Sequence, residues 1–159
     1  MRKKTIEDYL EIVYKLQKDN ETVHTNDIAS EMNINPSSVT EILGKLKDEG
    51  YINYKKYGGA SLTKKGLKLA IKTTDRHNTL KDFLILIGVN ENIAEMDACE
   101  MEHILHKNSM DAIIKFVEII KKCGFTPFWL HRLKKYIETD KIIDCPKDLE
   151  KYCKKYIKK

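Results

Sequence analysis

The sequence predicts a mostly α-helical protein with one or two small domains. Apolar residues recur at three- and four-residue intervals over most of the chain, which is the spacing of amphipathic helices. Only one short segment, residues 51–62, alternates as strands do, and a pair of glycines interrupts it. The 159 residues are 42% hydrophobic and 33% charged, so a packed core is possible and the composition is not that of a disordered chain.

Three helices are expected in the first fifty residues. The first covers about residues 6–17, the second is capped by Thr25, and the third opens at Pro36 and ends at Gly50. A tight turn at residues 33–36 joins the second helix to the third. Two short helices joined in this way have the layout of a helix-turn-helix, although helix pairs are common in proteins.

A β-hairpin is predicted directly after the third helix. Residues 51–57 alternate, Gly58 and Gly59 make the turn, and residues 60–62 return. A hairpin in this place is the wing of a winged helix-turn-helix, so we expect a DNA-binding domain over residues 1–73. Candidate DNA contacts lie at the start of the third helix and near the hairpin tip: Asn35, Ser37, Ser38, Thr40, Glu41, Lys55 and Lys56. For each lysine alone, a solvated surface position is an equally good interpretation.

The rest of the chain is predicted to be all-helical. A long helix runs from a Thr63 cap to Gly88, a second spans about residues 91–107, and a third is capped by Ser109. The wide apolar surface of this third helix suggests burial in a dimer as well as in the core. We expect a helical metal-binding and dimerisation domain over residues 74–122. A helical extension over 123–159 is expected to hold helices near 128–138 and after Pro146.

Charge is distributed unevenly along the chain. The net charge is +2 over residues 1–75, −4 over 76–106 and +7 over 107–159. A mildly basic protein is compatible with nucleic acid binding but does not establish it. The sequence holds no apolar run of membrane-spanning length and no signal core, so a cytoplasmic location is expected, with no membrane partner.

The acidic middle of the chain contains an unusual polar helix face. At about 100° per residue, a helix would bring Cys99, Glu102, His103 and His106 within roughly one third of its circumference. A thiol, a carboxylate and imidazoles are costly to bury together unless a divalent cation binds them. This face therefore predicts a transition-metal site. A lone cysteine is ordinarily a small buried hydrophobe, which is the alternative for Cys99.

The other three cysteines lie in the C-terminal part of the chain. No CxxC pair occurs, so the spacing indicates neither a disulfide framework nor a zinc knuckle. A separate metal site built from Cys123, Cys145 and Cys153 is a minor alternative.

Five segments, in this order, resemble one protein family. They are Glu7-Asp8-Tyr9-Leu10-Glu11, Asn35-Pro36-Ser37-Ser38-Val39-Thr40, the segment from Tyr57-Gly58-Gly59 to Leu62-Thr63-Lys64-Lys65-Gly66, Arg76-His77, and Cys99-Glu100-Met101-Glu102-His103. Together they resemble the metal-dependent repressors typified by the diphtheria toxin repressor and the manganese transport regulator, over about residues 4–122. The resemblance implies a homodimer of winged helix-turn-helix heads on a helical dimerisation domain. It also implies repression of metal-uptake genes at a palindromic operator. We expect the two-domain form, without the family's optional SH3-like domain.

The resemblance also implies a set of metal ligands. It assigns Asp8, Cys99, Glu102 and His103 to the main metal site, and Glu11 and His77 to a paired site. The thiol is similar to the iron-type members, whereas the two acids of the first helix are similar to the manganese type. Thiolate favours iron over manganese, while carboxylates and imidazole accept both, so we expect Fe(II), with Mn(II) as the second candidate.

One position departs from the family pattern. Lys81 stands where the family usually has a glutamate that helps to hold an ancillary metal. A protonated lysine has no lone pair to offer, so an ancillary metal is not expected there.

The expected mechanism joins the two domains through the metal. Binding M²⁺ would tie the acids of the first helix to the ligands of the metal helix, and this would fix the spacing of the DNA-binding heads. Two other functions are open on the residues alone. One is a metal-independent winged-helix regulator that uses the polar helix face only for packing. The other is a metal hydrolase, for which no catalytic cluster in a cleft is visible, so an enzyme is not expected.

Overall fold

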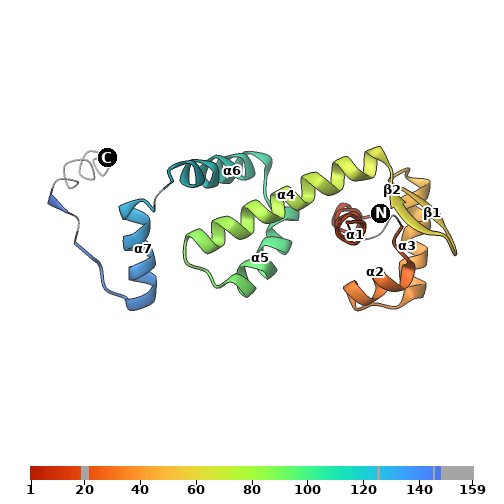
Figure 1. Cartoon of the computed structure of the whole chain (residues 1–159), viewed down its shortest axis with the longest axis horizontal. Helices are drawn as coiled ribbons and strands as arrows, with labels where there is room; N and C mark the ends of the chain where they lie inside the picture. Colours follow the sequence, from red (N-terminus) through yellow and green to blue (C-terminus); the bar gives the residue numbers. More distant parts are fainter. Residues whose placement is uncertain (19–21, 125, 145, 148–159) are drawn as a thin grey trace.

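A head built from the first three helices and a hairpin shares one long helix with a helical part of the chain in the computed structural model (Figure 1). The structure describes residues 1–18, 22–124, 126–144 and 146–147. The elements of the head are α1 (Lys3–Leu16), α2 (Thr25–Met32), α3 (Pro36–Asp48), β1 (Ile52–Lys55) and β2 (Gly59–Leu62). The elements that follow are α4 (Lys64–Leu86), α5 (Glu91–Ile104), α6 (Lys107–Lys122) and α7 (Phe128–Thr139). These elements confirm the predicted fold class.

The head is a winged helix-turn-helix. β1 and β2 pair in antiparallel register, with Ile52 opposite Leu62, and the positive φ of Gly59 (+81°) suits the hairpin that joins them. Val23, between α1 and α2, pairs with Ala60 as an additional bridge. The head core consists of residues from all three helices and the hairpin, including Leu10, Val13, Ile28, Val39, Leu43, Leu46 and Ile52. Because α1 contributes to this core, it is part of the head.

The long helix α4 is fastened to the head at its first turn. The Thr63 side chain caps it by accepting a hydrogen bond from the Gly66 N–H. A Cβ at position 66 would overlap the backbone carbonyl oxygen of Tyr51, so only glycine fits there. From this point α4 extends away from the hairpin and contacts α1, α5 and α6 (Figure 1).

A second, smaller core lies beyond the head. Leu80 of α4, Ala98 of α5 and Met110 of α6 are buried together. At the far end, the ring of Phe116 stacks near the ring of Trp129, with centroids 6.0 Å apart, which joins α6 to α7. In the described residues, no helix combines the length and the apolar character that crossing a membrane requires.

The junction of α5 and α6 differs from the sequence expectation. Helix α5 ends at Ile104, whereas the sequence predicted a helix to about residue 107. Helix α6 starts at Lys107. The His106 ring caps α6 by accepting a hydrogen bond from the Asn108 N–H. The Ser109 cap was wrong because a histidine nitrogen takes the place of the expected hydroxyl. The helix expected after Pro146 falls beyond the described residues, as do Cys145 and Cys153.

Candidate metal centre

The predicted ligands converge where α1, α4 and α5 meet. Asp8 and Glu11 lie one turn apart on α1, His77 lies near the middle of α4, and Glu102 and His103 are in the last turn of α5. The apolar stripe of α1 faces the head core, so the two acids lie beside it and look toward α4 and α5. The site therefore spans the two cores.

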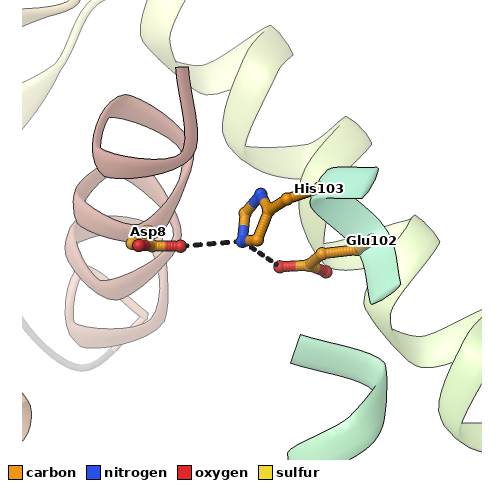
Figure 2. Close-up of side chains that lie close together, drawn as sticks. All are labelled: Asp8, Glu102 and His103. Atoms are coloured by element: carbon orange, nitrogen blue, oxygen red, sulfur yellow. Dashed lines mark ion pairs between the residues drawn. The ribbon is translucent and has the colours of Figure 1, made fainter. Parts of the chain in front are cut away.

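Two clusters of ligand atoms share one carboxylate. The first comprises Asp8, Glu102 and His103, and within each cluster the ligand atoms lie within 4.8 Å of one another. Figure 2 shows Asp8 and Glu102 directed at the same nitrogen of His103: Nε2 lies 2.8 Å from Asp8 Oδ1 and 3.2 Å from Glu102 Oε1. The second cluster comprises Glu11, His77 and Glu102, with His77 Nδ1 3.6 Å from Glu102 Oε2. One oxygen of Glu102 thus faces His103 of the first cluster, and the other faces His77 of the second.

The shared residue is deeply buried. Glu102 is 1% exposed, and neither of its side-chain oxygens has a hydrogen-bond partner; His103 Nε2 is also without one. An unsatisfied buried carboxylate is costly, and a divalent cation bound between such groups removes the cost. Oxygen and imidazole donors suit Mn(II) and Fe(II). The donor set therefore fits a divalent transition metal.

The buried charges of the two clusters raise the pKa values of three of their side chains. Burial raises the pKa of Asp8 and of Glu11, and the negative charge of Glu102 raises both further. The neighbouring Glu102 carboxylate, 3.6 Å from Nδ1, raises the pKa of the His77 imidazole. All three groups hold protons more tightly than usual, so protons compete with a metal for this site.

Glu7 supports His103 from the side away from the clusters. Its Oε2 lies 2.9 Å from His103 Nδ1, and Glu7 is 2% exposed. A carboxylate can only accept, so Glu7 accepts the hydrogen bond from the proton on Nδ1. Nε2 is then the nitrogen that would bind a metal lying between Asp8 and Glu102, once the metal displaces any proton there. Metal-binding histidines commonly have such an acceptor behind them.

Glu7 was not among the ligands or partners predicted from the sequence. The signal available was its place beside Ile6 and three residues before Leu10, within the apolar stripe of α1. An acid inside a buried stripe requires a partner.

Cys99 lies beside the clusters and is exposed. Its sulfur is not among the ligand atoms grouped in the two clusters. Partial burial, followed by the charges of Glu102 and Asp8, raises the pKa of this thiol. Its role as a ligand stays a prediction. His106 is engaged in capping α6 and contributes no ligand atom to either cluster.

The candidate DNA contacts lie on two exposed parts of the head. Ser37 and Ser38 are exposed in the first turn of α3, next to Asn35, and Lys55 and Lys56 are exposed at the hairpin. The remaining two are engaged within α3, where Thr40 donates a hydrogen bond to the Pro36 carbonyl (2.9 Å) and Glu41 pairs with Lys45 (2.6 Å).

A winged helix-turn-helix joined to carboxylate–histidine clusters defines a metal-dependent DNA-binding regulator. Comparison with protein families agrees with this class. Residues 1–60 match the iron dependent repressor N-terminal DNA binding domain, and residues 63–126 match the iron dependent repressor metal binding and dimerisation domain. The chain belongs to this family, which includes the diphtheria toxin repressor and the manganese transport regulator. Its members are DNA-binding transcriptional repressors, not enzymes, and the hydrolase alternative is thereby excluded.

Individual relatives cover most of the chain. An HTH-type transcriptional regulator from Methanocaldococcus jannaschii is 40% identical over 119 residues, which are 74% of this chain and 95% of that protein. The HTH-type transcriptional regulator MntR of Lysinibacillus sphaericus is 38% identical over 118 residues, 74% of this chain and 85% of the other. Among solved structures, the manganese regulator SloR is 29% identical with a TM-score of 0.63, over 71% of this chain and 53% of that one.

Proposed function

We propose that this chain is a homodimeric repressor of metal-uptake genes that binds its operator when Fe(II) or Mn(II) occupies the α1–α4–α5 junction. The observation that carries the proposal is the pair of unsatisfied Glu102 oxygens, each facing a cluster that includes an acid of the DNA-binding head. A metal in this position is bound by both domains at once.

The residues proposed to hold the metal are the six that the family resemblance implies: Asp8, Glu11, His77, Cys99, Glu102 and His103. The bound ion supplies positive charge to a junction that otherwise gathers carboxylates. Asp8 and Glu11 are fixed to the head through α1, and Glu102 and His103 are fixed to the second core through α5. Drawing these residues together sets the orientation of the head relative to α4 and α5.

Iron is the proposed first metal and manganese the second. The nearby thiol of Cys99 favours iron, whereas the carboxylates and imidazoles accept either ion. The family name supports iron, and the relative described as a manganese regulator supports manganese.

A homodimer is proposed from the family and from exposed apolar residues. Residues 63–126 match a dimerisation domain. Three large apolar side chains of α5 are exposed: Ile93 (53% exposed), Met96 (72%) and Ile104 (78%). Such a stripe is costly in water, and a second copy would cover it. Two heads related by a twofold axis would then meet a palindromic operator.

The first experiment is selection of DNA from a randomised duplex pool by the full chain, once with Mn(II), once anaerobically with Fe(II), and once with a chelator. We expect a two-fold symmetric sequence to be enriched with metal only. Equal enrichment with the chelator would favour a metal-independent winged-helix regulator. Sedimentation of the protein at micromolar concentration tests the dimer, and Ile104→Glu is expected to produce monomers.

A further inference from the structure

A row of four charged or polar side chains runs outward from the second cluster, between α4 and α5. His77 Nε2 lies 3.1 Å from Glu95 Oε1, and the other oxygen of Glu95 lies 2.9 Å from Lys81 Nζ. The same ammonium lies 3.2 Å from Glu91 Oε1. His77 and Lys81 are one turn apart on α4, and Glu91 and Glu95 are one turn apart on α5. The row therefore links consecutive turns of both helices.

The row determines which nitrogen of His77 faces the metal centre. Glu95 is half exposed and pairs with the Lys81 ammonium at 2.9 Å, which is the contact of a carboxylate, and a carboxylate can only accept hydrogen bonds. The N–H of a neutral His77 ring is then on Nε2, directed at Glu95. Nδ1, which lies 3.6 Å from Glu102, is therefore the nitrogen available to a metal once its proton is displaced.

Glu95 cannot hold this arrangement by burial alone. Its side chain is 54% exposed, whereas the side chain of His77 is 12% exposed. An exposed carboxylate samples several rotamers, and each departure would leave the His77 N–H without its acceptor. Lys81, itself held by Glu91, restricts that motion by binding the second oxygen of Glu95.

We propose that Glu95 is a positioning residue of the metal centre, which keeps His77 oriented with Nδ1 toward the second cluster, and that Lys81 holds Glu95 in place. The inference rests on the proposed function, because it assumes that His77 binds metal. From the sequence alone, Lys81 only replaces the glutamate that the family usually has as an ancillary metal ligand. In the structure it is the partner of the carboxylate behind His77, and its positive charge balances two acids of α5.

The first test is metal titration of the full chain with Co(II), followed by electronic absorption, and with Mn(II) by calorimetry. Glu95→Ala removes the acceptor and is expected to weaken binding at the His77 cluster by roughly 10-fold. Glu95→Gln keeps an oxygen that accepts from Nε2–H and is expected to stay within about 3-fold of the wild type. Both variants remove the same charge, so the difference between them measures positioning.

The matched control lies on the same helix. Glu100 is also an exposed acid of α5, but its partner is Lys4 at 2.6 Å. Glu100→Ala should leave metal affinity within about 3-fold of the wild type, the range allowed for a surface charge.

Lys81 is tested by a double-mutant cycle. Lys81→Met is expected to weaken binding in the wild-type background by about 3-fold and to have no effect in the Glu95→Ala background, because Lys81 acts through Glu95. Nitrogen NMR of the Zn(II)-loaded chain should find the His77 proton on Nε2 in the wild type, and this signature should be lost in Glu95→Ala.

The outcomes separate this inference from the proposed function. If the wild type binds metal and Glu95→Ala binds it equally well, or if Glu95→Ala and Glu95→Gln are equally weak, the positioning role is wrong and the proposed function stands. If the wild-type chain binds no divalent metal, both are wrong.

Discussion

Replacing Glu7 by methionine should weaken metal binding without unfolding the head. Methionine nearly preserves the volume of the buried side chain but cannot accept the hydrogen bond from His103 Nδ1, which spans 2.9 Å in the wild type. A hydrogen bond to a charged group contributes about 1.5 to 3 kcal/mol. Loss of the acceptor behind a metal-binding histidine typically costs about 10- to 100-fold in metal affinity, which corresponds to roughly 1.4 to 2.7 kcal/mol. The two ranges agree.

Calorimetric titration of Mn(II) into the Glu7→Met chain measures this loss. Glu7→Gln, which keeps an acceptor oxygen, should fall between the wild type and Glu7→Met. Lys3→Met is the control, because Lys3 is 72% exposed and lies 3.6 Å from Glu7, so its contribution is that of a weak surface pair. Wild-type metal affinity in Glu7→Met would refute the assignment of Glu7 as the support of His103.

Three further predictions concern other parts of the molecule. Metal affinity should rise between pH 6 and 8, because the pKa of His77 is raised and its proton must leave before Nδ1 can bind metal; calorimetry across this range should show a smaller rise for His77→Gln, and an equal rise would mean that His77 is not a ligand. Gly66→Ala should destabilise the fold by about 3 kcal/mol, because a Cβ there overlaps the Tyr51 carbonyl, and thermal unfolding should detect the lower midpoint. Lys55→Ala with Lys56→Ala should weaken DNA binding and reduce the salt slope by about 2 per head, or about 4 for the dimer, measured by anisotropy at several salt concentrations, whereas an unchanged slope would mean that these lysines do not meet phosphates.

Local patterns were sufficient to predict most of the fold. The apolar spacing of α1 and α4, the Thr63 cap and the glycine pair of the hairpin each depend on residues close in sequence, and each appears in the structure. The cap of α6 was mistaken because the helix begins earlier, at Lys107, so Ser109 lies inside its first turn and His106 caps it. Choices of this kind depend on the path of the preceding loop, which the local sequence does not specify.

Only part of the candidate metal site could be predicted from local patterns. Helical spacing placed Glu102 and His103 on one face, but only the family resemblance connected them to Asp8, about 95 residues earlier in the chain. The partners Glu7 and Glu95 were missed because a charged residue on a helix ordinarily faces water. Their roles appear only when α1, α4 and α5 are packed together, since neither acid is near its histidine in sequence.

The most direct test of the account is the affinity of the selected DNA for the protein with and without metal. In an anisotropy titration at fixed salt, saturating Mn(II), or Fe(II) under anaerobic conditions, should strengthen DNA binding of the wild type by about 5- to 150-fold. Asp8→Ala should lose most of this gain, because it removes the ligand through which the head reaches the metal. Equal DNA affinity with metal and with chelator would contradict the claim that a metal at the α1–α4–α5 junction controls DNA binding.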